Sequence, residues 1–202
     1  MKAGIIDYGA GNLRSVANAV QSLGIEPRIV AEPSGFEGLT HLILPGVGAF
    51  GDSIRELESR GLAEPIREWV RADRPFFGIC VGYQLLFEAG EESPGSTGLS
   101  IFDGNVVRFP DDGRKIPHMG WNAATATHPD DPIWDGLGEA PYFYFVHSYY
   151  PEPEDPELVA MWTEYEGVRF ASAIRRGNLL ATQFHPEKSQ QAGLRLLENF
   201  LK

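Results

Sequence analysis

The stretch PFFGICVGYQLLF, from Pro75 to Phe87, decides the fold because it joins an apolar run to an amphipathic one. The only cysteine of the chain, Cys80, stands at the junction between Gly78 and Gly82. This G-x-C-x-G arrangement is the thiol counterpart of a nucleophile elbow, in which a strand turns sharply into a helix and the glycines let the strained backbone pass. It predicts an exposed sulfur at a helix start, where unpaired amides and the helix dipole favour the thiolate. The competing interpretation is a small buried hydrophobic residue.

The segments before this stretch alternate between strand and helix patterns. Apolar runs bounded by turn residues predict strands, and apolar residues at helical spacing predict helices. The expected strands cover residues 2–7, 26–30, 41–45 and 75–80, and the expected helices cover 13–23, closed by Gly24, and 52–71, with Asp52 as a possible cap and breaks at Gly61 and Pro65. This order implies a parallel sheet with helices on both faces.

The segments after Glu92 are richer in short, turn-separated strands. We expect strands at 105–109, 121–127, 142–149, 159–165, 170–175 and 179–184, and a closing amphipathic helix at 190–201. The last two strands are joined by the turn Arg176 to Asn178, which predicts an antiparallel hairpin. No linker divides the halves, so the prediction is one α/β domain over residues 1–202, with a mixed, mostly parallel sheet flanked by helices and added antiparallel strands.

Composition excludes several classes of function. A net charge of −11 argues against general nucleic-acid binding, which needs clustered basic residues. No apolar run approaches the roughly 20 residues that span a bilayer, so we expect no membrane partner. The start MKAGIIDYGAGN shows no secretory signal, and a single cysteine cannot form an internal disulfide or a CxxC metal site. We therefore expect a cytoplasmic protein without a metal.

Two glycine loops follow strands and compete as binding loops. Gly9-Ala10-Gly11 resembles the start of a dinucleotide fingerprint, but Arg14 occupies the third glycine position, so a tight turn is the stronger interpretation. The second loop, Pro45 to Phe50, should lie with Cys80 at the carboxyl edge of the sheet, where open α/β proteins bind ligands. Its glycines would let backbone amides approach a substrate carbonyl, and the Val81 amide would supply a second donor.

A reactive thiolate needs a base, and the chain offers five histidines, at positions 41, 118, 128, 147 and 185. His185 belongs to TQFHPEK at a strand end, where side chains two residues apart point the same way. Pro186 disfavours a helical conformation at His185, so Glu187 can orient the imidazole by a hydrogen bond. The pattern predicts a nucleophile, base and orienting acid in Cys80, His185 and Glu187.

Two further segments lie near this chemistry. Gln84 is one helical turn after Cys80, so it should share the face of the sulfur and contact what the sulfur attacks. The GEE sequence at Gly90 to Glu92 is most simply a solvated helix end, although one acid could fold back towards the amino group of a substrate.

The motifs GICVGYQ, PGVG and HPE resemble the triad family of class I glutamine amidotransferases, over essentially the whole chain. YGAGN, PHMGWN at Pro117 to Asn122 and YFVHSYY within Tyr142 to Tyr150 are similar to the glutaminase subunits of imidazole glycerol phosphate synthase. The resemblance implies a flavodoxin-like architecture. Val81 stands where leucine is commoner in the motif, which changes nothing that the chemistry requires.

The resemblance also implies roles. Cys80, His185 and Glu187 would hydrolyse L-glutamine to glutamate and ammonia without a cofactor. Further positions would form the oxyanion loop (Gly46, Val47, Gly48, Val81), position glutamine (Gln84, Glu92, His147, Ser148, Tyr149) and dock a partner (Asn12, Trp121, Lys188). For Trp121, core packing is an equal alternative.

The partner implied is a (β/α)8 barrel cyclase, which would form a heterodimer with this chain and use the ammonia in histidine biosynthesis. No such barrel fits in this chain. The alternatives are the same chemistry for another synthase, a dinucleotide-binding module and a peptidase with the same elbow.

Overall fold

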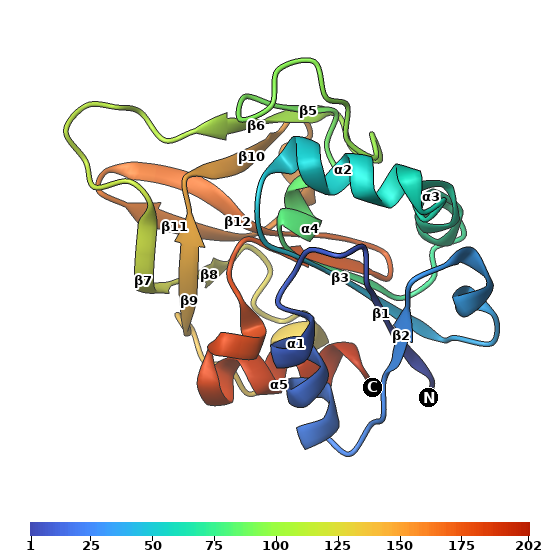
Figure 1. The fold of residues 1–202 in the computed structure, drawn as a ribbon. Coiled ribbons are helices and arrows are strands. Elements are labelled where there is room, and N and C mark those ends of the chain that lie inside the picture. The colour runs from blue at the N-terminus through green and yellow to red at the C-terminus, as the bar shows by residue number, and fades with distance from the viewer.

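The computed structural model describes residues 1–202 and is built around an eight-stranded sheet (Figure 1). Its strands, in spatial order, are β2 (Arg28–Val30), β1 (Ala3–Ile6), β3 (His41–Gly46), β4 (Phe76–Cys80), β13 (Leu179–Thr182), β12 (Val168–Arg176), β11 (Val159–Tyr165) and β8 (Thr125–Ala126). The pairs from β2 to β13 are parallel, and those from β13 to β8 are antiparallel. The predicted mixed sheet is therefore confirmed.

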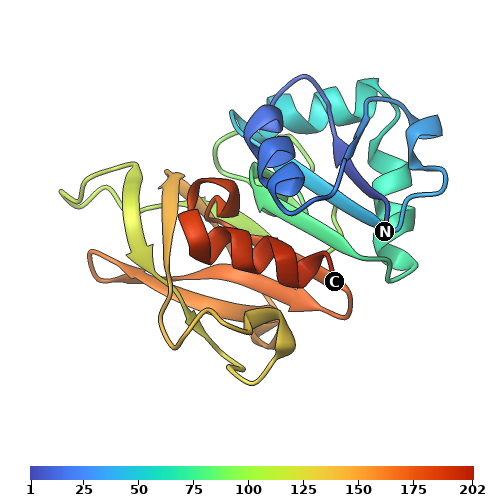
Figure 2. The same ribbon diagram turned by 90° about the horizontal axis from the view of Figure 1, so that it is seen from below.

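The helices cover both faces of the sheet. The helices α1 (Leu13–Ser22) and α5 (Gln190–Phe200) lie together on one face, which Figure 2 turns towards the viewer. The helices α2 (Phe50–Ser59) and α3 (Ala63–Arg71) cover the opposite face (Figure 1). Because β3 and β4 lie between these two layers, almost every residue in them is buried, as expected for central parallel strands.

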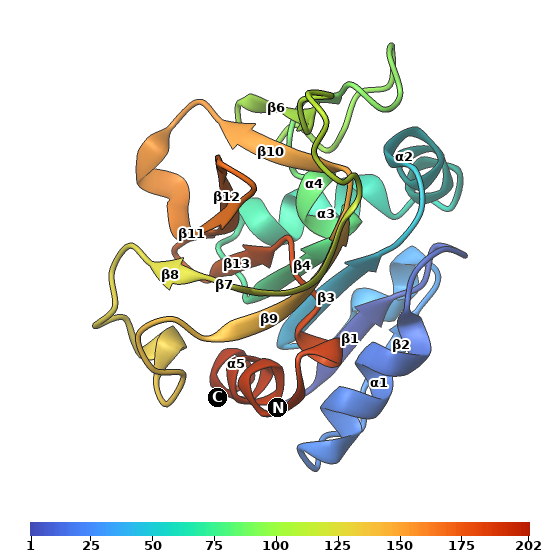
Figure 3. The ribbon, with the colours of Figure 1, turned by 90° about the vertical axis from the view of Figure 1, so that its left-hand side faces the viewer.

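Two smaller sheets complete the fold. One contains β10 (Tyr149–Pro153), β6 (Gly104–Arg108) and β5 (Ala89–Gly90). The other is an antiparallel ribbon of β7 (His118–Ala123) and β9 (Tyr142–His147), which run side by side in Figure 3. The register of this ribbon places His118 opposite His147.

Most of the interior forms one apolar cluster of 53 buried residues that extends through both halves of the chain. The burial of this shared core is the main stabilising contribution, since apolar surface removed from water contributes roughly 25 cal/mol per Å². None of the helices has the length and apolarity that a membrane crossing requires.

Several predicted boundaries were wrong. The helix predicted from Asp52 begins at Phe50 and is not capped by its own N-cap residue, and it ends before α3 begins at Ala63. The helix after Cys80, α4 (Val81–Gln84), is only four residues long. The strands predicted at 121–127 and 142–149 are each divided between two sheets: β7 and β9 pair with each other, whereas β8 joins the main sheet and β10 joins the three-stranded sheet. The turn at Arg176 to Asn178 is confirmed by the β12–β13 hairpin.

Candidate active site

The backbone at Cys80 has the strained geometry of a nucleophile elbow. Cys80 adopts φ 55° and ψ −108°, a conformation that non-glycine residues rarely occupy and that concentrates at functional sites. The flanking glycines are needed because other backbone atoms approach them closely, and not because their own φ angles are unusual. A Cβ on Gly82 would lie 2.0 Å from the carbonyl oxygen of Leu44, and one on Gly78 would lie 2.9 Å from the carbonyl oxygen of Gly82. The turn therefore packs directly onto β3.

The expectation of an exposed sulfur at a helix start needs correction. Cys80 is only 4% exposed and reaches solvent through a cavity. Because α4 has a single turn, it has no long array of peptide dipoles to act on the sulfur.

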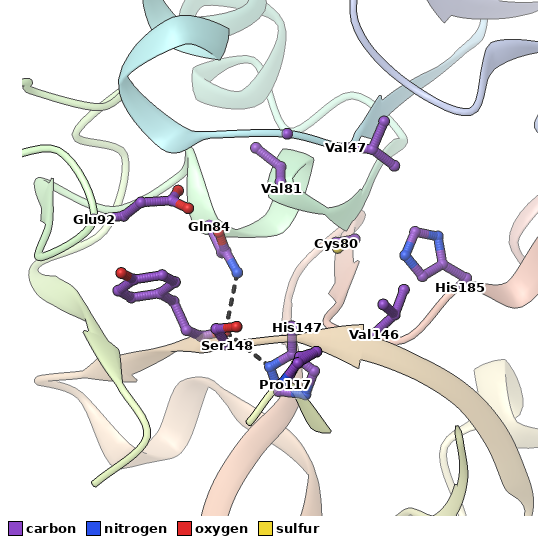
Figure 4. A pocket seen from close by; sticks show the side chains of 12 residues that line it. Val47, Cys80, Val81, Gln84, Glu92, Pro117, Val146, His147, Ser148 and His185 are labelled. Carbon is purple, nitrogen blue, oxygen red and sulfur yellow. Dashed lines mark hydrogen bonds between the residues drawn. The ribbon is translucent and has the colours of Figure 1, made fainter. Parts of the chain in front are cut away.

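A cavity of about 310 Å³ opens above Cys80 (Figure 4). This volume falls in the range of small-molecule sites. In Figure 4 the side chain of His185 faces Cys80 across the cavity, while Gln84 and Glu92 lie on the other side of the sulfur. The lining residues are Val47, Gly48, Cys80, Val81, Gln84, Glu92, Pro117, Val146, His147, Ser148, Tyr149 and His185.

The candidate base, His185, and its candidate orienting acid, Glu187, form a buried pair behind the cavity wall. His185 Nδ1 lies 2.8 Å from Glu187 Oε1, and the two side chains are 1% and 0% exposed. Asn12 Nδ2 donates to the same carboxylate oxygen at 3.0 Å. Because the carboxylate can only accept, His185 Nδ1 carries the proton and Nε2 has no partner within the fold. The unpartnered nitrogen is the one that can exchange protons at the cavity.

The charges of His185 and Glu187 depend on each other and on the sulfur of Cys80. Burial alone would lower the pKa of His185, but the negative charge of the Cys80 sulfur and the hydrogen bond with Glu187 outweigh burial and raise this pKa to about 10. Burial would raise the pKa of Glu187, yet its hydrogen bond with His185 holds that pKa below its usual value. The arrangement therefore favours the protonated form of His185 beside an ionised Glu187.

The glycine loop at the end of β3 lies beside the sulfur. The register of β3 against β4 places Gly46 opposite Cys80, and Val47 and Gly48 line the cavity with Val81. Gly46 itself lies behind the wall, where an added Cβ would be 2.6 Å from Gly82 N and 2.8 Å from the Tyr8 hydroxyl. The parts of this loop that line the cavity are therefore Val47 and Gly48, which Gly46 holds close to the elbow.

The acid at Glu92 has a role that the sequence did not suggest. Glu92 Oε2 accepts from the backbone amide of Phe50 at 2.8 Å, and Ser93 Oγ accepts from that of Gly51 at 3.0 Å. These two side chains cap α2 from a distant segment, so the interpretation of Gly90 to Glu92 as a solvated helix end was wrong. Glu92 also lines the cavity, which joins the start of α2 to the candidate substrate site.

The segment His147 to Tyr149 forms the wall of the cavity opposite the elbow. The carbonyl oxygen of Tyr149 accepts from Gln84 Nε2 at 3.1 Å and from His147 Nδ1 at 2.8 Å. His147 Nε2 in turn lies 3.0 Å from His118 Nδ1. Burial lowers the pKa of His118 to about 4 and that of His147 to about 3, so both rings are neutral near pH 7.

A buried amide that sequence reasoning missed lies between these groups. Gln183 Nε2 lies 3.7 Å from Cys80 Sγ, and Gln183 Oε1 accepts from Gln84 Nε2 at 3.2 Å. Gln183 is two residues before His185, so the same alternation that selected Glu187 could have selected it.

The three residues predicted to dock a partner lie around the β7–β9 ribbon and the HPEK turn. Trp121 is 46% exposed, so the core-packing alternative for this residue was wrong. Its ring lies 6.2 Å from that of Tyr144, and Lys188 Nζ lies 6.0 Å from the same tyrosine ring. Asn12 lies at the end of the first glycine loop and reaches this region through its hydrogen bond to Glu187.

Fold and site together define a class: an α/β protein with a nucleophile elbow and a cysteine, histidine and glutamate that hydrolyse or transfer acyl groups. Comparison with known proteins agrees. The sequence matches the family Glutamine amidotransferase class-I over residues 4–202. It is 49% identical to "Imidazole glycerol phosphate synthase subunit HisH" of Syntrophotalea carbinolica, over 97% of each chain. It is 45% identical to the HisH subunit of Synechococcus sp. strain JA-3-3Ab, over 100% of this chain and 94% of the relative.

Solved structures support the fold. A glutamine amidotransferase crystal structure superposes with a TM-score of 0.77 at 23% identity, covering 100% of this chain and 97% of that one. The structure of PurLQS from Thermotoga maritima has a TM-score of 0.77 at 19% identity, covering 99% and 97%. The chain belongs to the class I glutamine amidotransferases and, within them, to the HisH subunits of imidazole glycerol phosphate synthase.

Proposed function

We propose that the whole chain acts as one glutaminase domain that hydrolyses L-glutamine to glutamate and ammonia through Cys80, His185 and Glu187. The observation that carries this proposal is the geometry of the triad: Cys80 and His185 line one cavity, and Glu187 holds the far side of the imidazole at 2.8 Å. The family membership supplies glutamine as the substrate.

In the first half of the reaction, the Cys80 thiolate attacks the side-chain amide carbon of glutamine. Backbone amides of Val47, Gly48 and Val81 are the candidates to stabilise the oxyanion that forms. The intermediate collapses when His185 gives its Nε2 proton to the amide nitrogen, which leaves as ammonia. Cys80 then carries a glutamyl thioester, and His185 is neutral.

The coupled charges explain why His185 can give up this proton. The raised pKa of about 10 depends largely on the negative charge at the Cys80 sulfur. When the sulfur becomes a thioester, that charge disappears and the pKa of His185 falls, because Glu187 alone remains against the effect of burial. His185 can then take a proton from water, which attacks the thioester, releases glutamate and restores the thiolate and imidazolium.

The cavity offers complementary groups for the rest of glutamine. Gln84 Nε2 is committed to Tyr149 and Gln183, which leaves Gln84 Oε1 as an acceptor towards the cavity. The Glu92 carboxylate, whose Oε2 caps α2, supplies a negative charge for the α-ammonium group. The backbone of His147, Ser148 and Tyr149 completes the opposite wall.

The ammonia needs a second protein. We propose a heterodimer in the cytoplasm with a (β/α)8 barrel cyclase, which uses the ammonia to form imidazole glycerol phosphate and aminoimidazole carboxamide ribotide. The exposed side chains on and beside the β7–β9 ribbon support this docking face: Trp121 is joined by Met119 and Tyr142, which are 59% and 60% exposed. Aromatic residues and methionine are enriched in protein interfaces.

The decisive experiment measures glutamate and ammonia release by the purified chain, alone and with the cyclase and its nucleotide ligand. We expect low activity alone and a rise with the partner. Cys80→Ala should abolish hydrolysis, and hydrolysis retained by this variant would reject the thiol mechanism. Equal rates with and without the cyclase would reject the coupling. Release of peptide fragments instead of ammonia would favour a peptidase.

A further inference from the structure

Gln183 is a polar side chain enclosed in the interior beside the nucleophile. It is 0% exposed, and its backbone amide donates to the carbonyl oxygen of Ser172 on the neighbouring strand. This ladder bond does not require the carboxamide. A buried amide is unfavourable unless it is hydrogen-bonded, and here both ends of the group contact residues of the active site.

The hydrogen bonds determine which way this carboxamide points. The carbonyl oxygen of Tyr149 can only accept, so the atom of Gln84 that contacts it must be the amide nitrogen. The same nitrogen lies 3.2 Å from Gln183, so Gln183 presents its oxygen to Gln84. Its nitrogen is then left to face Cys80 Sγ at 3.7 Å. The reverse orientation would set two donors against each other and a carbonyl oxygen against the thiolate.

We propose that Gln183 donates a hydrogen bond to the Cys80 thiolate, stabilises the charged sulfur and holds it in the attacking position. This role rests on the proposed use of Cys80 as the nucleophile. Hydrogen bonds to a charged group are stronger than those between neutral groups, and a donation made to the thiolate is weaker towards the thiol. Gln183 therefore favours the reactive form.

Other titratable groups near the Cys80 sulfur also influence its charge, independently of Gln183. His185 faces it from the segment after β13, with Glu187 behind. The Tyr8 hydroxyl approaches from the end of β1, and burial raises its pKa to about 12, so it stays neutral. His147 on β9 is neutral as well. The attraction between Cys80 and His185 remains when Gln183 is replaced, so the loss should be partial.

The test is the rate at which iodoacetamide alkylates Cys80 as a function of pH. Cys80 is the only cysteine, so the whole signal belongs to it. In Gln183→Met, which keeps the length without the donor, we expect the pH midpoint of alkylation to rise by about one unit, a tenfold slower rate below both midpoints. Turnover of glutamine should fall through kcat more than through KM.

Ser172→Ala is the matched control, because it removes a buried hydroxyl that has no hydrogen-bond partner from the adjacent strand. It should leave the alkylation profile unchanged. A profile in Gln183→Met that coincides with wild type would overturn the proposal, even if turnover falls. Alkylation requires no glutamine, so a failure of the proposed glutaminase activity would show separately as absent ammonia release by the wild-type protein in the presence of the cyclase and its nucleotide ligand.

A measurement on the unmodified protein covers the case in which Gln183→Met does not fold. The side-chain amide resonances of Gln183 should shift with the same pH midpoint as Cys80 alkylation, and this shift should disappear in Cys80→Ser. Resonances that do not respond to the thiolate would contradict the proposal.

Discussion

The backbone amide of His185 donates a hydrogen bond of 3.0 Å to the carbonyl oxygen of Tyr144, which ties the proposed general base to the β7–β9 ribbon. Ser189 closes the same contact: its Oγ accepts from Tyr144 N at 2.9 Å and donates to the His185 carbonyl at 2.6 Å. The rings of Tyr144 and Trp121 lie edge-on to each other, with their centres 6.2 Å apart. A displacement of the β7–β9 ribbon by a docked partner would therefore be transmitted to the backbone of His185 through Tyr144.

Replacing Ser189 with alanine tests this fastening. The variant loses both Oγ bonds, so we expect kcat to fall about fivefold to tenfold, the equivalent of about one hydrogen bond, with little change in KM. Steady-state glutaminase kinetics in the complex measure it. Ser22→Ala is the control, because Ser22 Oγ also donates to a backbone carbonyl, at 2.7 Å, but at the far end of α1. If both variants behave alike, the contact with Tyr144 does not serve catalysis.

Glutamine in place of Glu187 separates charge from orientation. His185 and Asn12 both contact Oε1, so the amide oxygen of Glu187→Gln can keep both hydrogen bonds. Only the negative charge behind the imidazolium is lost, and we expect kcat to fall roughly 10- to 100-fold, the scale of one positioned acid–base contribution. Glu187→Ala loses orientation as well and should be slower still. Equal losses in the two variants would show that orientation contributes nothing.

Glu92 and Ser93 separate helix capping from substrate binding. Glu92→Gln keeps an acceptor for the Phe50 amide but loses the charge, so KM for glutamine should rise at least tenfold, since hydrogen bonds to charged groups contribute about 1.5–3 kcal/mol. Ser93→Ala loses the cap on Gly51 and should lower the free energy of unfolding by about 1 kcal/mol without changing KM. Chemical denaturation and kinetics on both variants give the comparison. A raised KM in Ser93→Ala would mean that capping, and not the charge, controls binding.

The parts of the site that the sequence predicted are local in the chain. The elbow is contained in five residues around Cys80, and His185 and Glu187 are separated by one proline that keeps the backbone extended. The parts that were missed depend on contacts between distant segments. Gln183 meets Cys80 across 103 residues, and Glu92 caps α2 across 42. Such pairs follow from strand order, which alternation patterns do not specify.

The same reason explains the errors in the fold. The residues around 121–127 and 142–149 have good strand patterns, but a pattern does not say which sheet a strand joins. β7 pairs with β9 instead of the main sheet, which leaves Trp121 and Met119 exposed. These exposed apolar residues, on a ribbon separate from the main sheet, make the β7–β9 surface a candidate docking site.

Trp121→Ala tests that surface. An exposed tryptophan at the centre of an interface contributes at least about 2 kcal/mol, so we expect the dissociation constant for the cyclase to rise about 30-fold or more. Isothermal titration calorimetry measures it. Ile29→Ala is the control, since Ile29 is 43% exposed on β2 at the opposite edge of the main sheet. Unchanged affinity in Trp121→Ala would place the interface elsewhere.

His118 and His147 form a hydrogen-bonded chain in which the tautomer of each ring is determined by its partners. His147 Nδ1 must donate to the Tyr149 carbonyl, so its Nε2 accepts from His118 Nδ1, and His118 Nε2 accepts from Asn122 Nδ2 at 3.3 Å. Asn122 is fixed because it also donates to the carbonyl oxygen of Glu164 at 2.8 Å. Protonating either ring would set two donors against each other. The chain therefore resists charge on both rings.

This chain predicts a loss of stability in mild acid. The pKa values of His118 and His147 are about 4 and about 3 in the fold, below the value of 6.5 for an unperturbed histidine. Below pH 6.5 the unfolded state binds protons that the folded state does not, so stability falls with pH, by about 2 kcal/mol per histidine at pH 5. His41, whose pKa is lowered mainly by burial, acts in the same direction. His185 opposes this trend only near pH 7: with a pKa of about 10 it stays protonated in the fold, so the stability it contributes rises while the unfolded state gains its proton around pH 6.5 and levels off at lower pH. Urea unfolding between pH 7 and pH 5 measures the slope, with His128→Gln as an exposed control that should leave it unchanged. A stability that is flat over this range would mean that the folded protein accepts protons on this pair.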